Sequence, residues 1–185
     1  YYEKNLKKIY MEHKDYQQFF HSAKQFPYKK HHNSKIRVAY ISADFRKHVM
    51  FSFYQAMLCT YDKSKFEIIC YCLNKEDNDS EYLKRQVNEW YNLYEIPWGD
   101  IGQKIYRDNI DILVDLSGHT IGNALPVFAY RPALIQISGL GYIGPIGLST
   151  IDYYLTDKYC CPSGLPDKYF SEKPLKLMNS QFCYT

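Results

Sequence analysis

Short apolar runs alternate along this chain with longer stretches in which apolar side chains recur every three or four residues. The runs are rich in β-branched and aromatic residues and therefore predict β-strands. They cover residues 36–42, 66–73, 112–116, 134–138, 153–156 and 175–178, with a weaker candidate at 94–97. The amphipathic stretches predict helices at residues 1–24, 51–60, 79–91, 100–107 and 124–130. We expect Asp79 or Ser80 to cap the third of these helices and Asp100 to cap the fourth.

The order of these elements predicts the fold class. Strands that are separated by helical segments need crossover connections, and such connections join parallel strands. We therefore expect an α/β fold with a Rossmann-like, doubly wound and mostly parallel sheet. A polar, turn-rich segment at residues 27–35 indicates a boundary near residue 35. It divides the chain into a helical connector at residues 1–35 and a sheet domain at residues 36–185.

Composition narrows the class of protein. The 185 residues are 46% hydrophobic and 23% charged, which suits one globular domain and excludes a disordered tail. A net charge of only +3 gives no indication of nucleic-acid binding, and no apolar run approaches the roughly 20 residues that cross a bilayer. The six cysteines lack CxxC spacing, which argues against structural zinc and favours a cytoplasmic protein. Because the sequence opens on Tyr1, we expect an excerpt of a longer protein.

Ligand sites in such sheets lie beyond the carboxyl ends of the strands, which directs attention to four loops. These loops are residues 43–48, 74–79, 117–123 and 139–147. His48 in the first loop could act as a base or orient a hydroxyl group, or it could be a histidine at the surface. Four glycines within residues 139–147 allow a ligand or a second domain to approach the backbone, and a flexible loop is the alternative.

The loop after the strand at 112–116 joins small residues to the start of a helix. It contains Ser117, Gly118, His119 and Thr120. Backbone N–H groups and the helix N-terminus would face one point there, which suits an anionic or phosphate-bearing ligand. A tight turn that requires glycine explains the same residues equally well, since the order matches neither a Walker loop nor GxGxxG. No Ser-His-Asp order or carboxylate pair specifies a hydrolase.

Three segments of the chain resemble one family of enzymes. Residues 36–48 are IRVAYISADFRKH, residues 108–136 are DNIDILVDLSGHTIGNALPVFAYRPALIQ, and residues 140–157 are LGYIGPIGLSTIDYYLTD. In order and spacing they are similar to the protein O-linked N-acetylglucosamine transferases and their SPINDLY-type bacterial relatives. The resemblance covers about residues 36–185. Residues 1–35 would then correspond to the connector that follows an upstream tetratricopeptide repeat array.

The resemblance implies a GT-B glycosyltransferase with two Rossmann-like lobes, of which this chain is the first and the donor-binding second lobe is absent. It implies inverting, metal-independent transfer of N-acetylglucosamine from UDP-GlcNAc to Ser or Thr of proteins, with no cofactor besides the donor substrate. By itself the fragment would be inactive. His48 would be the active-site histidine. The substrate-binding positions would be Ser117, Gly118, His119 and Thr120 on the acceptor and sugar side, and Gly141, Tyr142 and Gly144 at the cleft between the lobes.

Several residues depart from the pattern of that family. Gly139 stands where the family usually has a bulky aromatic residue, Ile143 and Pro145 replace Pro and Thr, Ala124 replaces Arg, and Leu134 replaces Pro. Because these positions border the expected cleft, two alternatives stay open. One is a relative that uses another donor, such as GDP-fucose, and the other is a non-catalytic binding or scaffolding domain derived from this fold.

Overall fold

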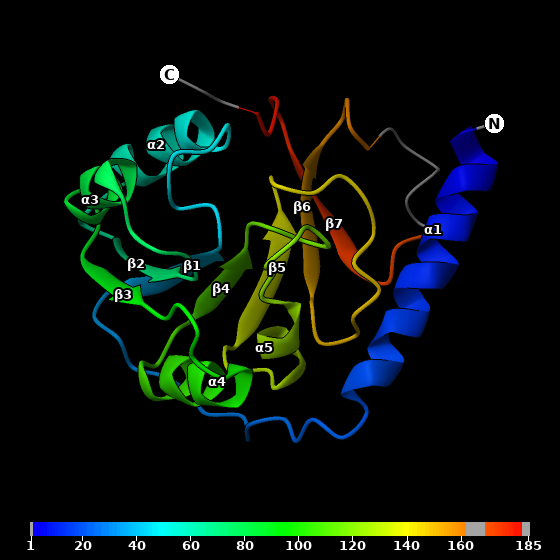
Figure 1. Cartoon of the computed structure of the whole chain (residues 1–185), viewed down its shortest axis with the longest axis horizontal. Coiled ribbons are helices and arrows are strands. Elements are labelled where there is room, and N and C mark those ends of the chain that lie inside the picture. Colours follow the sequence, from blue (N-terminus) through cyan, green and yellow to red (C-terminus); the bar gives the residue numbers. More distant parts are fainter. Residues whose placement is uncertain (1, 162–168, 183–185) are drawn as a thin grey trace.

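A computed structural model describes residues 2–161 and 169–182 of the chain (Figure 1). Its seven strands form one sheet in the order β3-β2-β1-β4-β5-β6-β7, and every neighbouring pair is parallel. The strands are β1 (Ile36–Ser42), β2 (Phe66–Cys72), β3 (Glu89–Asn92), β4 (Ile112–Asp115), β5 (Ile135–Gly139), β6 (Tyr153–Asp157) and β7 (Lys173–Leu177). The helices are α1 (Tyr2–Tyr16), a short 3-10 helix (Gln17–Phe20), α2 (Phe51–Cys59), α3 (Asn78–Lys84), α4 (Trp98–Arg107) and α5 (Leu125–Ala129).

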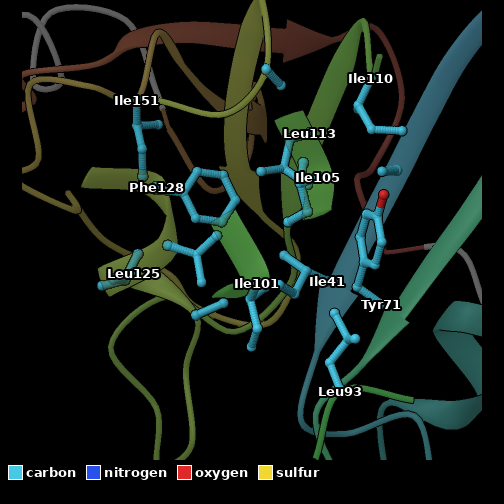
Figure 2. Packing of buried hydrophobic residues seen from close by; sticks show 14 of the residues in the cluster. Ile41, Tyr71, Leu93, Ile101, Ile105, Ile110, Leu113, Leu125, Phe128 and Ile151 are labelled. Carbon is cyan, nitrogen blue, oxygen red and sulfur yellow. The ribbon is translucent and has the colours of Figure 1, made fainter. Parts of the chain in front are cut away.

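Helices cover both faces of the sheet, so the predicted doubly wound α/β class is confirmed. One apolar cluster joins α2 and α3 to one face of β1, β2 and β4 through residues such as Val38, Tyr54 and Leu83. A second cluster joins α4 and α5 to the opposite face (Figure 2). Successive strand residues point to opposite faces, which is why the neighbouring Val38 and Ala39 belong to different clusters.

Figure 2 shows the larger cluster, in which Ile41, Ile105 and Phe128 lie among the labelled residues from strands and helices. The side chain of Phe128 is fully buried, and so are those of Ile41 and Ile105. Burial on both faces explains why β1 and β2 are almost continuous apolar runs in the sequence.

The register of the central strands brings their carboxyl ends together. Ser42 pairs with Cys72 across β1 and β2, and Asp115 pairs with Ile41 on one side and Ser138 on the other. The loops that follow β1, β4 and β5 therefore leave the sheet side by side. This shared edge is where the sequence placed the candidate site.

The prediction for residues 79–97 is wrong in three respects. The helix begins one residue after Asp77, which caps it by accepting hydrogen bonds from the N–H groups of Asp79 and Ser80, and it ends at Lys84. Residues 89–92 form β3, whereas no strand occurs at 94–97. Arg37 joins β1 to the two strands on this side of the sheet, β2 and β3: its guanidinium pairs with Glu67 at 2.7 Å and with Glu89 at 2.8 Å.

The remaining boundaries differ from the predictions by smaller amounts. Pro97, rather than Asp100, occupies the N-cap of α4, and Asp100 lies in the first turn of that helix. The predicted helix at residues 1–24 ends at Phe20, where its last turn is a 3-10 helix. Strands β5 and β7 begin one residue later and two residues earlier than predicted, respectively.

The helix α1 stands at the end of the sheet where β7 lies, and the following segment passes below the sheet to β1 (Figure 1). That segment is packed rather than loose. The N–H of Phe26 donates to the carbonyl of Tyr130 at 2.8 Å, and its ring stacks on Tyr106. Asn33 donates to Asp111 at 2.9 Å. Among the described residues, none of the helices has the length and apolarity that a membrane span requires.

Candidate functional site

Three loops meet at the carboxyl edge of the sheet, namely residues 43–48 after β1, 117–123 after β4 and 140–147 after β5. We refer to them below as the edge loops. The first two are linked inside the protein by the hydroxyl groups of Ser42 and Ser117, whose oxygens lie 3.4 Å apart. The Ser42 hydroxyl also accepts the backbone N–H of Asp44 at 3.0 Å. The ends of β1 and β4 are therefore tied together directly beneath the candidate site.

Asp115 fixes the start of the second edge loop. Its carboxylate is fully buried and accepts hydrogen bonds from the N–H of Ser117 at 3.1 Å, the N–H of Gly118 at 2.8 Å and the hydroxyl of Ser138 at 2.6 Å. Burial raises the pKa of Asp115, and these three hydrogen bonds oppose that increase. The carboxylate of Asp115 therefore does not face solvent, and it holds the loop by accepting hydrogen bonds from inside the fold.

Close backbone packing brings the second and third edge loops together. A side chain on Gly141 would overlap the carbonyl oxygen of Leu116, so only glycine allows the two loops to touch there. Gly118 has a φ of +54°, and a side chain on it would overlap the ring of Tyr142. The predicted residues Gly118, Gly141 and Tyr142 are thus brought into one cluster, and Gly144 lies at the edge of the same ring.

His48 occupies the exposed end of the first edge loop, three residues before the start of α2. Its Nδ1 accepts the N–H of Met50 at 3.3 Å, and its Nε2 lies 3.9 Å from a carboxylate oxygen of Asp44. The loop below it is rigid, because Phe45 is fully buried and its carbonyl accepts the hydroxyl of Ser80 at 2.6 Å. The imidazole of His48 is therefore exposed to solvent, and the loop that carries it is held in place by the core.

His119 is directed into a group of aromatic rings instead. Its Nε2 donates to the carbonyl of Ile146 at 2.8 Å, and its ring stacks on His13 of α1 with centroids 3.8 Å apart. The rings of Tyr16 and Tyr142 close the other sides at 5.1 Å and 5.5 Å. Burial lowers the pKa of His119. In this arrangement His119 joins the second edge loop to the third and to α1.

Most backbone N–H groups that we expected to face an anion already have partners within the loop. Those of Ser117 and Gly118 donate to Asp115, and that of Thr120 donates to the carbonyl of Ser117 at 3.2 Å. The Thr120 hydroxyl donates to the same carbonyl at 2.9 Å. The helix that follows has only five residues. The geometry is that of a glycine-dependent turn, which was the alternative explanation for these residues.

Sequence reasoning missed the residues that hold the edge loops in place. Asp115 and Ser138 form the buried anchor, and His13 and Tyr16 reach the site from more than 100 residues away in the sequence. A signal for Asp115 existed, since an Asp two residues before Ser-Gly at the end of a buried strand is typical of a side chain that caps its own turn. Within residues 2–161 and 169–182, no group of three His, Cys, Asp or Glu side chains could hold a metal ion.

Comparison with known proteins identifies the family. The family model described as Glycosyl transferase family 41 matches residues 3–184. In structure, the chain is similar to the Thermobaculum terrenum O-GlcNAc transferase mutant K341M, with a TM-score of 0.86 and 25% sequence identity. That match covers 93% of this chain and 34% of the other.

Curated relatives give the same result. A probable UDP-N-acetylglucosamine–peptide N-acetylglucosaminyltransferase SPINDLY from Solanum lycopersicum is 32% identical over 96% of this chain. The UDP-N-acetylglucosamine–peptide N-acetylglucosaminyltransferase of Caenorhabditis elegans is 34% identical over 75% of it. The chain spans only 20% and 12% of these two relatives. With a family model matched along nearly its whole length, the chain belongs to glycosyl transferase family 41.

Proposed function

We propose that this chain is the N-terminal lobe of a protein O-linked glycosyltransferase that transfers N-acetylglucosamine from UDP-GlcNAc to Ser or Thr of proteins. The observation that carries the proposal is the family match over residues 3–184. The relatives are named for a UDP-N-acetylglucosamine donor and a peptide acceptor. In this chain, the edge loops are formed by the same three segments that resemble the family.

The proposed reaction is a single displacement. The oxygen of the acceptor hydroxyl attacks the anomeric carbon from the face opposite the diphosphate, the bond from that carbon to the diphosphate oxygen breaks, and UDP leaves. The hydroxyl proton passes to solvent water, and the configuration at the anomeric carbon is inverted. We propose no metal and no cofactor besides the donor, with the negative charge of UDP stabilised by helix N-termini and cationic side chains.

His48 would contact an oxygen of the sugar or of the acceptor. Since its Nδ1 accepts the N–H of Met50, the neutral imidazole carries its proton on Nε2. Nε2 therefore offers a hydrogen-bond donor, which Asp44 at 3.9 Å helps to orient. As a general base, His48 would first have to give up the contact with Met50. Donation to a substrate oxygen is the role that agrees with the observed hydrogen bond.

The exposed apolar side chains around the edge loops favour the view that another lobe or a partner protein covers this surface. Val49, Ile121 and Ile143, one from each loop region, are 75%, 98% and 61% exposed. Apolar side chains gathered at one edge are typical of a surface that another lobe or a protein partner covers. We propose that the donor-binding second lobe of the same protein and the acceptor occupy this side.

We further propose that α1 continues an upstream tetratricopeptide array and that the protein works in the cytoplasm. The N-terminal end of α1 lies at the outer side of the molecule (Figure 1), which agrees with a chain that arrives from preceding repeats. The thiols of Cys70 and Cys72 are free and buried, as expected in a reducing compartment.

The test of this function is the variant His48→Ala in the protein that includes the second lobe. We expect the rate of sugar transfer to fall by about 100-fold, as for loss of a group that contacts the reacting atoms, with little change in the free energy of unfolding. His32→Ala is the matched control, since His32 is also exposed but lies in the segment that leads into β1, at the amino end of that strand, whereas His48 follows its carboxyl end. Equal transfer by the parent and His48→Ala would remove His48 from the site.

A further inference from the structure

The helix α1 is seated on the third edge loop by direct backbone contact. Gly147 has a φ of +77°, and a side chain on it would overlap the backbone carbonyl group of His13. One turn further along, the N–H of Ser149 donates to the side chain of Gln17 at 2.9 Å. Gly147 is therefore required for this close contact, because even the methyl group of an alanine would overlap the backbone of α1.

His13 uses both of its ring nitrogens at this contact. Its Nδ1 donates to the carbonyl of Pro145 at 2.6 Å, so the neutral ring carries its proton there. Its Nε2 then accepts the hydroxyl of Tyr142, 3.2 Å away. The face of the same ring stacks on His119, with centroids 3.8 Å apart and the planes inclined by 20°. One side chain of α1 thus contacts both the second and the third edge loops.

The two rings that His13 touches are the ones that define the candidate site on this side. Tyr142 lies over Gly118, where no side chain would fit. His119 is the next residue in the chain after Gly118 and is held by the carbonyl of Ile146. A displacement of His13 would therefore remove a contact from both rings that pack against the Ser117–Thr120 turn, while the hydrogen bonds from the turn to Asp115 would stay.

We infer that His13 is a positioning residue, through which the placement of the N-terminal helix α1 sets the geometry of the Ser117–Thr120 turn. The inference rests on the proposed function, because the turn matters to transfer only if it belongs to the site. The inference also assigns a role to the connector at residues 1–35. A shift of α1 would change the geometry of the turn through the stacked rings of His13 and His119.

The charges around the stack make this contact sensitive to pH. Burial lowers the pKa of His13, and the neighbouring His119 lowers it further. The carbonyl of Pro145 and the carboxylates of Glu12 on α1 and Glu172 ahead of β7 oppose this change. Among the described residues, Tyr16 and Tyr142 also pack against the rings, and burial raises the pKa of both. Either of the stacked rings can take up a proton, but two imidazolium ions in face-to-face contact repel each other. A fall in pH should therefore weaken the contact between α1 and the edge loops.

The structural test is a nuclear magnetic resonance titration of His119 in the chain and in two variants. His13→Ala removes the ring from α1 but preserves the helix, and we expect it to move the backbone amide signals of residues 117–120 and to raise the pH midpoint of His119. His13→Phe restores a ring without a charge. It should return both the amide signals and the pH midpoint of His119 towards their parent values, because the Phe ring restores the burial that lowers the pKa of His119.

His21→Ala is the matched control, because His21 is an exposed histidine whose Nδ1 contacts only the nearby carbonyl of Gln18 among the described hydrogen bonds. It should leave the signals of residues 117–120 unchanged. The inference is overturned if His13→Ala, with its helix content intact by circular dichroism, leaves both the amide signals and the His119 midpoint as in the parent.

A kinetic test separates this inference from the proposed function. In the protein with both lobes, we expect His13→Ala to lower kcat by about tenfold with a smaller change in the donor KM, and His13→Phe to recover most of it. If the parent transfers sugar and His13→Ala matches it, the positioning role is wrong. If the parent transfers no sugar, the proposed function fails, while the titration still decides whether His13 positions the turn.

Discussion

The substitution Asp115→Ala tests the anchor beneath the candidate site. It removes the acceptor of three buried donors, which are the N–H groups of Ser117 and Gly118 and the hydroxyl of Ser138. A buried donor that loses its partner costs about 1–3 kcal/mol. Three such losses, offset in part because a buried charge is also removed, give an expected destabilisation of roughly 3–5 kcal/mol.

Asp115→Asn separates the lost hydrogen bonds from the lost charge. The amide oxygen still accepts, but its NH2 group faces one of the donors, so we expect a smaller cost of about 1–2 kcal/mol. Because burial already raises the pKa of Asp115, the neutral side chain loses little by being uncharged. Asp100→Ala, at an exposed position in the first turn of α4, is the control and should cost less than about 1 kcal/mol.

The assay for these variants is guanidinium unfolding, combined with hydrogen exchange at the amides of Ser117 and Gly118. We expect faster exchange at both amides in Asp115→Ala, since the hydrogen bonds that protect them are gone. A destabilisation of Asp115→Ala no larger than that of Asp100→Ala, with exchange unchanged, would refute the view that this carboxylate holds the turn.

Three further outcomes follow from the edge loops. Gly141→Ala should cost about 1–3 kcal/mol in thermal unfolding, because the new methyl group overlaps the carbonyl of Leu116; an unchanged Tm would mean that the loops part easily. Gly118→Val should displace Tyr142 and lower both donor affinity and transfer in the two-lobed protein, whereas parent-like values would take this turn out of the site. Burial lowers the pKa of His13 and of His119 below the ordinary value of 6.5, so the unfolded chain binds more protons than the folded chain in mild acid. The free energy of unfolding should therefore decrease as the pH falls from 6.5 through these lowered pKa values. The measurement is the difference in this pH dependence between the parent and His13→Phe. An identical pH dependence in the two proteins would contradict the role of His13.

The central strands were predictable because their signal is local. Ile36–Ser42 was predicted to the residue, and Phe66–Cys72 to within one, since strands buried on both faces must be apolar almost throughout. The edge strand β3 was not predictable in this way. Residues 89–92 are only partly buried, and they pair with β2 and with Arg37, which lie far from them in the chain.

The site shows the same division between local and distant causes. Gly118 and Gly141 could be singled out from the sequence, since glycine at a strand end marks a close approach, but the sequence does not say what approaches. The structure supplies Tyr142 for the first and the carbonyl of Leu116 for the second. The position of His119 could not be predicted, because it depends on His13 in a helix 106 residues earlier.

Incubation of the two-lobed protein with UDP-GlcNAc, UDP-glucose and GDP-fucose tests the central claim most directly, with nucleotide release and intact protein mass as the readouts. We predict release of UDP from UDP-GlcNAc, accompanied by addition of one or more N-acetylhexosamine units to Ser or Thr of a protein. A mass increase with GDP-fucose alone would contradict the proposed donor. A folded protein that releases no nucleotide from any of the three donors would contradict the transferase function itself.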